Sequence, residues 1–545
     1  MKILFVASEC APFVKTGGLA DVAGTLPRAL SKFGMDMRVI LPKYRDIDEY
    51  WKSQMEHLVS FHINLGWRRQ FCGIDYLVYD GVTYYFVDNE FYFARNSVYG
   101  SGNEEGERFG YFCRAVLESL VHIGFWPDLI HCNDWQTGMI PALLKTQYSF
   151  YKDIKTLFTI HNLRFQGIFP WLYIDDLLGV GDQYFTPEYL EYYGCISFMK
   201  GGLVFADCIN TVSPTYAQEI KTQYYGERMD GMIRKRADCV SGILNGIDTD
   251  EYDPTNDEQI PFHFGVDDMS GKAQCKAFIQ EELGLEQRKE PALIGIITRL
   301  TDQKGLDLIE CVLEDIMLND VQLIVLGVGE EHYQELFSWA AWRYQGRIAT
   351  RIEHNNPLAH RIYAGCDMLL MPSQFEPCGL GQMIAMRYGT VPIVRETGGL
   401  KDSVKSFNKY TLEGNGFSFS NYNAHEMLFT LERALGHFWD KPTWDRIVRS
   451  AMESDFSWDA SAHNYLRLYE KTTGKVFLPI THTQSCQNTD TAQEETDSSE
   501  QHITLQEGPT NENPANEDPV NENQVSIKTK KTRKPQKPKI KKRPL

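Results

Sequence analysis

The sequence predicts an α/β fold made of two doubly wound lobes with a cleft between them. Short apolar runs of strand length alternate with amphipathic segments of helix length, which is the pattern of parallel sheets covered by helices. These runs fall into two sets, separated by a cluster of turn residues near positions 245–254. The chain has 545 residues, which is too long for one ordinary hydrophobic core, so two or three domains are expected.

The first lobe is expected over residues 1–245. Its amphipathic segments at 23–33 and 107–122 have the apolar spacing of helices that cover one face of a sheet. Its buried strands are predicted at the apolar runs 3–7, 37–42, 127–135 and 155–162.

The second lobe is expected over residues 246–455 and repeats the same alternation. An amphipathic helix is predicted at 423–436. The buried strands are predicted at 291–300, 321–329, 366–373 and 390–399.

The composition changes abruptly near residue 480. Residues 480–527 contain acidic residues and no Lys or Arg, whereas residues 528–545 contain Lys and Arg and no acid. The whole stretch is poor in aromatic residues, so we expect 480–545 to be a disordered tail. Its basic end could contact a nucleic acid, an anionic membrane or a protein. The favoured interpretation is a solvated tail whose basic end folds back on its own acidic part. No partner of the tail is identified.

Charge and cysteine content restrict the class of protein. A net charge of −18 argues against nucleic acid as a partner of the main body. The twelve cysteines show no CxxC pairs, which is typical of reduced thiols in the cytoplasm. The first apolar run is preceded by a single lysine and is short, so it indicates a β-strand rather than a signal peptide. No window resembles a membrane span, and we expect a soluble cytoplasmic protein that requires no membrane.

The stretch "KTGGLADVAG", residues 15–24, follows the first predicted strand. A strand that ends in a glycine turn and opens a helix directs unpaired backbone N–H groups toward one point, which suits an anion. Lys15 beside that point suits a phosphate. An ordinary turn, in which Gly17 and Gly18 only permit a tight bend, is at least equally compatible with this stretch alone.

Other polar residues also stand at the carboxyl ends of predicted strands, where α/β proteins bind ligands. Each could be a surface charge or a satisfied polar residue, but together they predict one cleft with three cations, two acids and two glycine turns. Cations and helix-start amides suit a diphosphate leaving group, and Glu376 suits a developing positive centre. The residues concerned are Lys15, Asp134, Trp135, His161, Asn162, Arg299, Lys304 and the segment 375–381.

Metal chemistry has little support in the sequence. There is no HExxH motif and no group of residues that resembles a catalytic triad. Asp46 with Asp48, and Asp248 with Asp250, match the short D-x-D pattern that can hold a metal–diphosphate pair. Two such matches are unremarkable in an acidic chain, so no metal is expected.

Several motifs carry a family resemblance over about residues 1–475. "KTGGLADV", "TIHNLRFQG", "TVSPTYAQEI", "GILNGID", "TRLTDQKGLDL" and "MPSQFEPCGL" are similar to motifs of the bacterial glycogen synthase and plant starch synthase family, in the same order. The resemblance implies a GT-B fold, in which two Rossmann-like lobes hold a sugar nucleotide mainly on the C-terminal one. It also implies that the segment 456–476 returns as a final helix on the first lobe.

The resemblance also implies roles for individual residues. From the first lobe, Lys15 and Gly18 would approach the donor phosphates, with Asp21 nearby. His161 and Asp134 would lie close to the donor glucose, and Glu376 would face it. The remaining positions implied to bind substrate are Asn245 at the edge between the lobes, Arg299 and Lys304 on the diphosphate, Gly379 and Leu380 with helix-start amides, and His354 where a stacking aromatic ring is common.

The reaction implied is transfer of glucose from ADP-glucose to the 4-hydroxyl of an α-1,4-glucan end, with retention at the anomeric carbon and no cofactor or metal. Two alternatives stay open. One is a GT-B glucosyltransferase that uses UDP-glucose or makes a small disaccharide. The other is a glucan-binding scaffold without catalysis, against which the cations and Glu376 weigh, because a pure binder gains little from a diphosphate site.

Overall fold

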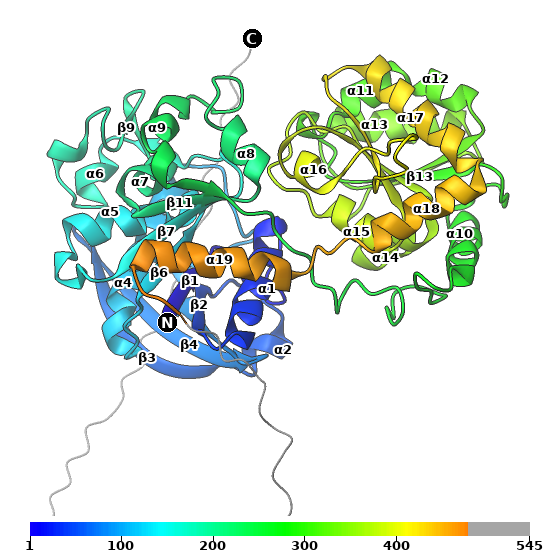
Figure 1. Cartoon of the computed structure of the whole chain (residues 1–545). Helices are drawn as coiled ribbons and strands as arrows, with labels where there is room; N and C mark the ends of the chain where they lie inside the picture. The colour runs from blue at the N-terminus through cyan, green and yellow to red at the C-terminus, as the bar shows by residue number, and fades with distance from the viewer. Residues whose placement is uncertain (478–545) are drawn as a thin grey trace, which may run out of the picture. The chain divides into compact units, whose positions relative to one another are not determined.

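The computed structural model describes residues 1–477. Within them, a nine-stranded and a six-stranded sheet each lie among helices, and a separate three-stranded sheet is also present (Figure 1). We call the part built on the nine-stranded sheet the N-terminal lobe and the part built on the six-stranded sheet the C-terminal lobe. The predicted α/β fold of two doubly wound lobes is confirmed. The tail predicted over 480–545 lies outside the described residues.

The nine-stranded sheet has its topological switch at β1. This strand pairs in parallel with β2 on one side and with β6 on the other. Residues Ile3 to Val6 of β1 are fully buried, as expected for a central parallel strand. In spatial order the strands are β12 (Val240–Gly242), β11 (Cys208–Thr211), β7 (Lys155–Ile160), β6 (Leu129–Asn133), β1 (Lys2–Val6), β2 (Asp36–Pro42), β5 (Val82–Asp88), β4 (Arg68–Tyr79) and β3 (Glu56–Leu65).

An antiparallel extension at one edge of this sheet was not predicted. β3 pairs with β4 and β4 with β5 in antiparallel register. Most residues of β3 are exposed or half-buried, so β3 lacks the continuous apolar run by which the parallel strands were found. The small sheet was also missed, since its strands are only two or three residues long: β8 (Ile168–Pro170), β10 (Cys195–Ser197) and β9 (Glu191–Tyr192).

The six-stranded sheet is parallel throughout and has its switch at β13, which pairs with β14 on one side and β16 on the other. All the strands predicted for this lobe are present. In spatial order the sheet contains β15 (Ile348–Arg351), β14 (Val321–Leu326), β13 (Ala292–Ile297), β16 (Met368–Met371), β17 (Val391–Arg395) and β18 (Phe417–Phe419).

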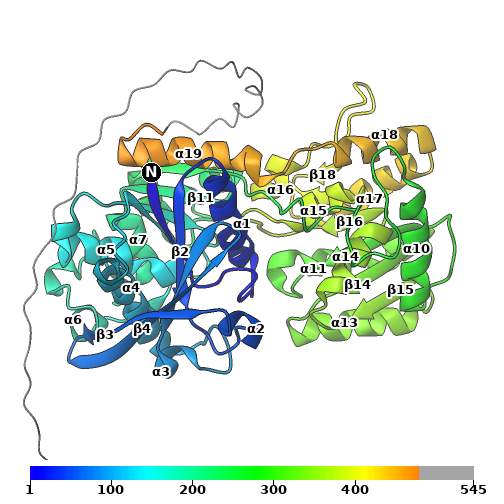
Figure 2. The same cartoon turned by 90° about the horizontal axis from the view of Figure 1, so that it is seen from below.

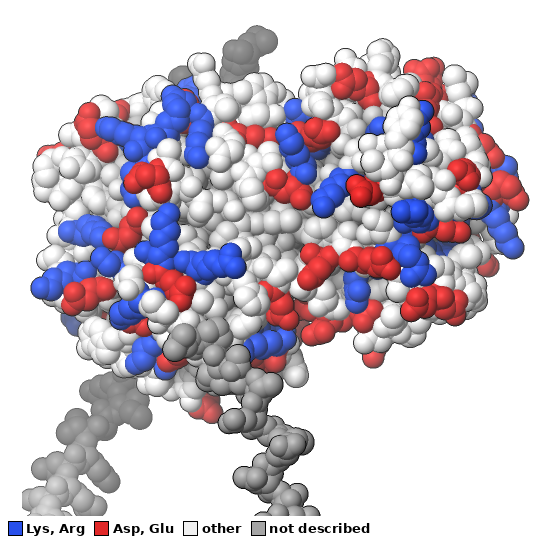
Figure 3. All heavy atoms as spheres, in the orientation of Figure 1, with Lys and Arg blue, Asp and Glu red and all other residues white. Residues whose placement is uncertain are grey.

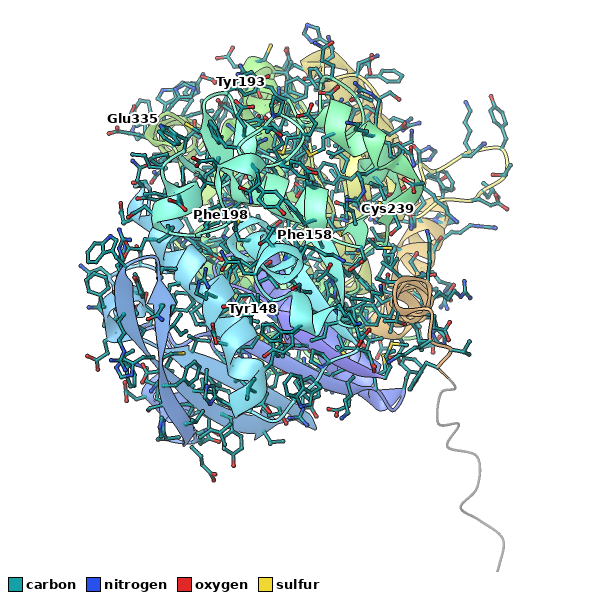
Figure 4. All side chains as sticks on the ribbon, turned by 90° about the vertical axis from the view of Figure 1, so that its left-hand side faces the viewer. Tyr148, Phe158, Tyr193, Phe198, Cys239 and Glu335 are labelled. Carbon is teal, nitrogen blue, oxygen red and sulfur yellow. The ribbon has the colours of Figure 1, made fainter. Side chains whose placement is uncertain are left out.

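Helices cover the N-terminal sheet and bury its side chains. Phe158 of β7 and Phe198 at the start of α7 are fully buried in this core, whereas Tyr193 is exposed at its periphery (Figure 4). The helices of this part are α1 (Gly18–Lys32), α2 (Glu49–Lys52), α3 (Glu90–Phe93), α4 (Glu104–His122), α5 (Met139–Thr146), α6 (Tyr173–Asp176), α7 (Phe198–Phe205), α8 (Pro214–Glu219) and α9 (Asp230–Lys235).

The C-terminal lobe has its own core, in which α17 buries Met427, Leu431 and Leu435. Its helices are α10 (Ser270–Leu283), α11 (Leu306–Cys311), α12 (Leu313–Leu318), α13 (Glu331–Arg343), α14 (Asn356–Gly365), α15 (Gly381–Arg387), α16 (Gly398–Ser403), α17 (Ala424–Phe438) and α18 (Lys441–Met452). None of the helices found within residues 1–477 is long and apolar enough to cross a membrane.

The last helix, α19 (Trp458–Thr473), returns to the N-terminal lobe, where it packs against α1 and β7 (Figure 2). The hydroxyl of Tyr469 lies 2.8 Å from Nδ1 of His131 in β6. The returning chain runs beside the outgoing one, because the N–H of Ile247 donates to the carbonyl of Phe456 at 2.9 Å. A Cβ on Gly246 would lie 2.7 Å from the backbone nitrogen of Trp458, so this close approach requires glycine. Both sheets fit within the expected lobe limits, 1–245 and 246–455, which stay predictions.

Basic and acidic side chains are interspersed over both lobes on the face shown in Figure 3. Of the eleven cysteines in residues 1–477, eight are buried, and all eleven are free thiols.

Candidate active site

A cavity of about 570 Å³ is lined by residues of both lobes. Its walls come from segments that follow β1, β6 and β7 in one sheet and β13 and β16 in the other, so it lies at the carboxyl ends of strands at both topological switches. Eleven of the twelve residues predicted to bind substrate or act in catalysis line it: Lys15, Gly18, Asp21, Asp134, His161, Asn245, Arg299, Lys304, Glu376, Gly379 and Leu380.

His354 is the exception. It is exposed in the loop between β15 and α14 and is not among the residues that line this cavity. Its contact with a base therefore has no support from the geometry and stays a prediction.

Gly17 and Gly18 line the cavity at the start of α1. Gly17 has φ −160°, an extended conformation that any residue adopts, and no side chain caps the helix. A Cβ on Gly18 would lie 3.8 Å from Cδ1 of Leu380 in the other lobe. The two glycines are therefore not needed for a tight bend. They leave space at the start of a helix that faces the other lobe.

The Lys15 side chain is partly exposed and is held by Asp21, with 2.6 Å between Nζ and Oδ1. Glu9 fixes the same loop, because its Oε2 atom accepts hydrogen bonds from the N–H and the hydroxyl of Thr16, each at 2.6 Å. Burial is the largest cause that raises the pKa of Glu9 and of Asp21. Glu9 was not predicted, because its charge stands alone in an apolar segment.

Asp134 supports the segment that carries His161. Its Oδ1 atom accepts a hydrogen bond from the N–H of His161 at 2.7 Å. Burial raises the pKa of Asp134 to about 7. The residue has φ +56° and ψ −178°, a strained conformation that non-glycine residues rarely adopt and that often occurs at functional sites.

His161 is held as a neutral imidazole. Its Nε2 atom lies 2.9 Å from Oδ1 of Asn133. The amide nitrogen of Asn133 donates to the carbonyl of Val6 at 3.0 Å, so the amide oxygen faces His161 and Nε2 carries the proton. Burial lowers the pKa of His161 to about 3. The ring therefore carries no charge at neutral pH.

Lys304 and Glu376 form an ion pair in the C-terminal half of the cavity. The distance from Nζ to Oε2 is 2.5 Å, and the side chains are 15% and 8% exposed. The Ser373 hydroxyl donates to the same carboxylate oxygen at 3.1 Å. Arg299 is exposed on the cavity wall, which leaves its guanidinium accessible to an anion.

Gly379 lies between Glu376 and the start of α15. Its φ is +72°, and a Cβ there would lie 2.5 Å from Oε1 of Gln382 and 3.1 Å from Cγ of Glu376. A side chain at this position would therefore displace Glu376. Glycine is required by both the conformation and the packing.

Two further groups have polar atoms ready for a ligand. The side-chain oxygens of Asn245 and Gln136 are buried, line the cavity and have no hydrogen-bond partner among residues 1–477. Gln136 directly follows Trp135, which was predicted to stand at the cleft, so the sequence did offer a signal for it. Tyr99, whose hydroxyl lies 2.8 Å from the Ser8 hydroxyl, also lines the cavity but comes from a loop with no recognisable pattern.

No residue of the D-x-D pairs lines this cavity. Asp48 caps α2 by accepting from the N–H of Tyr50 at 2.7 Å, and Asp248 pairs with Arg28 at 2.6 Å. Across the described part of the chain, no group of three or more His, Cys, Asp or Glu residues is placed to hold a metal ion.

Comparisons with known proteins agree over most of the chain. Residues 2–235 match the family model described as starch synthase catalytic domain, and residues 280–436 match glycosyl transferases group 1. Glycogen synthase from Geobacillus thermodenitrificans is 52% identical over 485 residues, which are 88% of this chain and all of the relative. Glycogen synthase from Anoxybacillus flavithermus is 54% identical over 474 residues, 86% of this chain and 98% of the relative.

Solved structures give the same result. The catalytic domain of starch synthase IV from Arabidopsis thaliana, bound to ADP and acarbose, matches with a TM-score of 0.82 and 33% identity, over 87% of this chain and 99% of that one. Sucrose-phosphate synthase from Thermosynechococcus elongatus matches with a TM-score of 0.56 and 17% identity over 86% and 98%, which is a likeness of fold alone. The chain belongs to the glycogen synthase and starch synthase family of GT-B glycosyltransferases.

Proposed function

We propose that this glycogen synthase transfers glucose from ADP-glucose to the 4-hydroxyl at the non-reducing end of an α-1,4-glucan, with retention at the anomeric carbon. The observation that carries the proposal is the meeting of Lys15, Arg299 and Lys304 on one cavity with Glu376 and His161. The first three suit a leaving diphosphate, and the last two suit the sugar that it leaves.

The diphosphate gains negative charge as its bond to glucose breaks. Cations in a partly dry site interact with that charge more strongly than they would in water. Burial raises the pKa of Glu9, Asp21 and Asp134, so these acids are less charged at a given pH than exposed carboxyls, which favours an anionic ligand in the same cavity.

The sugar gains positive charge in the same step. Lys304 and Ser373 both contact the Glu376 carboxylate and hold it in place. The carboxylate would therefore stabilise the positive charge on the sugar without having to move during the reaction. The neutral His161 ring, oriented by Asn133, would hydrogen-bond the sugar without adding an opposing positive charge.

The choice of ADP-glucose and of a glucan acceptor is supported by similarity. The relatives at 52% and 54% identity are glycogen synthases, and the starch synthase IV structure contains ADP and acarbose. No cofactor or metal is part of the proposal, because the three cations supply the positive charge that a divalent ion would otherwise provide. A cytoplasmic location is also proposed, on the ground that the cysteines are free thiols in residues 1–477.

One assay tests the proposal. The purified full-length chain is given a glycogen primer with ADP-glucose or UDP-glucose in parallel, each with and without excess EDTA. We expect incorporation from ADP-glucose with a much higher kcat/KM than from UDP-glucose, and no loss with EDTA. Equal kcat/KM for both donors would contradict the donor choice, and loss with EDTA that Mg²⁺ restores would contradict the metal-free site.

The absence of transfer from either donor, with glycogen still bound, would favour a catalytically inactive glucan-binding scaffold. The α-configuration of the product bond, read by its cleavage with an α-1,4-specific amylase, tests retention.

A further inference from the structure

A segment of the N-terminal lobe contacts the main chain around Glu376. This segment, residues 213–225, contains α8, which packs against α16 of the C-terminal lobe (Figure 1). Glu376 precedes α15 in the same lobe as α16. Helices α8 and α16 are far apart in sequence, so no local sequence pattern indicated their contact.

Glu219 is the last residue of α8, and its carboxylate binds the turn that opens α16. Its Oε1 atom accepts from the Thr397 hydroxyl at 3.0 Å and, like Oε2, from the N–H of Gly398 at 3.1 Å. The charged groups that face this carboxylate are Arg395 and Asp402 of the C-terminal lobe. Asp402 is itself bound by Thr215, whose hydroxyl donates to it at 2.6 Å.

The turn bound by Glu219 packs directly on the backbone of Glu376. The N–H of Gly399 donates to the carbonyl of Glu376 at 3.2 Å and to that of Pro377 at 3.2 Å. A Cβ on Gly398 would lie 2.0 Å from the carbonyl oxygen of Glu376, which shows how close the two segments are. A shift of this turn therefore moves the main chain that carries Glu376.

Two more contacts link the N-terminal lobe to the same loop. The hydroxyl of Ser213 donates to the carbonyl of Pro377 at 2.7 Å. The hydroxyl of Tyr225 accepts from Nη2 of Arg395 at 3.1 Å, and Nη1 of this arginine donates to the carbonyl of Gln374 at 2.6 Å. The loop is thus held from the other lobe on both sides of Glu376.

We infer that Glu219 is a positioning residue for Glu376: through the 397–399 turn it fixes the Glu376 loop relative to the N-terminal lobe, which carries Lys15 and His161. The inference rests on the proposed role of Glu376 in turnover. Correct placement matters because a shift of about 1 Å in a reacting group costs on the order of a hundredfold in rate. A donor can still bind through Arg299 and Lys304 when Glu376 is displaced, so the effect is on turnover.

The first experiment measures kcat and KM of Glu219→Gln in the full-length protein. Glutamine keeps the shape of the side chain, but it removes the charge and directs an NH₂ group at the N–H of Gly398. We expect kcat to fall about tenfold, with KM for the donor changed by less than about twofold and Tm nearly unchanged. Gln218→Ala, at the exposed neighbouring position on α8, is the matched control and should keep full kcat.

The second experiment repeats Glu219→Gln in a Glu376→Ala background. If Glu219 acts through Glu376, the loss caused by Glu219→Gln should nearly disappear there, because coupled residues are not additive. A residue that only supports the fold would lower kcat by the same factor in both backgrounds. Should Glu219→Gln fail to fold, Tyr225→Phe takes its place, since it removes the contact to Arg395 that holds the same loop.

The outcomes separate this inference from the proposed function. The donor is whichever nucleotide glucose the wild-type chain uses, so a wrong donor choice does not affect the result. A wild-type chain with no transfer from any donor overturns both. An active wild-type chain whose Glu219→Gln variant keeps full kcat, or loses the same factor with and without Glu376, overturns the inference alone.

Discussion

The ammonium group of Lys304 lies 2.5 Å from the carboxylate of Glu376, within the cavity that both lobes line. The group proposed to bind the leaving diphosphate and the group proposed to stabilise the sugar therefore hold each other in place. Removing one partner of a largely buried ion pair leaves the other without compensation. The two substitutions should still differ in kinetics, because the side chains would act on opposite charges of the transition state.

Glu376→Ala should fold and lose most turnover. Removing a preorganised group that faces developing charge typically costs about 10²–10³ in kcat, whereas Arg299 and Lys304, which are proposed to bind the donor, are kept. We expect a modest change in donor KM, measured with ADP-glucose and glycogen at several donor concentrations. A kcat near that of wild type would show that Glu376 is structural.

Lys304→Ala should lower kcat/KM by several powers of ten, corresponding to about 3–5 kcal/mol. The variant loses the cation proposed to bind the diphosphate and leaves Glu376, whose side chain is 8% exposed, without its counter-charge. Lys401→Ala, at an exposed lysine of α16, serves as the control. If Lys304→Ala and Lys401→Ala had equal kcat/KM, Lys304 would not act on the diphosphate.

Lys15→Ala should impair both donor binding and turnover. Lys15 lines the cavity from the N-terminal lobe and pairs with Asp21, so it can reach the donor only where the two lobes meet. We expect a higher donor KM together with a lower kcat, whereas Lys32→Ala at the exposed end of α1 should change neither. An effect on kcat alone would argue against a direct contact with the donor.

The pKa of Asp134 predicts a pH-dependent stability difference. Because burial raises this pKa to about 7, between about pH 4 and pH 7 the folded protein keeps a proton that the unfolded chain has released. The contribution of Asp134 to stability is therefore present at low pH and is lost as the pH rises through 7.

Asp134→Asn removes this titration and keeps an oxygen that can accept from the N–H of His161. From pH 5 to pH 8, the stability of wild type relative to Asp134→Asn should fall by up to about 3 kcal/mol, at 1.36 kcal/mol per pKa unit. Thermal unfolding of both proteins across this range measures it. A constant difference in Tm would contradict a titrating Asp134.

Truncation after residue 479 should leave specific activity and Tm nearly unchanged. The composition of 480–545 predicts a segment that buries little apolar surface. A relative that is matched over all of its length accounts for only 88% of this chain, so the family fold does not need the whole of it. A large loss of activity or Tm on truncation would show that the tail docks on the enzyme.

The strands of both switch points could be read from the sequence because they are buried on both faces. The apolar run at 3–7 covers most of β1 and the run at 291–300 contains β13, and nearly all residues of both strands are buried. β3 and the start of β4 could not be found in this way, because most of their residues are exposed or half-buried and form no continuous apolar run. The contact between α8 and α16 could not be found either, since the two helices are far apart in sequence.

The part of the site that could be predicted from the sequence consists of polar residues that follow these buried strands. Lys15, Asp134, His161, Arg299 and Glu376 all do so, and all line the cavity. Tyr99 also lines it but comes from the loop between α3 and α4, and the path of a loop has no periodicity that predicts it. Glu9 follows β1 as Lys15 does, but no motif or neighbouring charge indicated it. His354 follows β15 yet lies outside the lining, because β15 is at the edge of its sheet and away from the switch.

The two connections between the lobes bond to each other, since Ile247 and Ser457 form a parallel bridge. A single peptide connection can twist about many bonds, whereas two joined side by side resist torsion along their common length. The pair therefore opposes twisting of one lobe against the other, which keeps the N-terminal side of the cavity aligned with the C-terminal side. A chain that ended before residue 456 would lose that alignment together with α19, even though every residue lining the cavity would still be present.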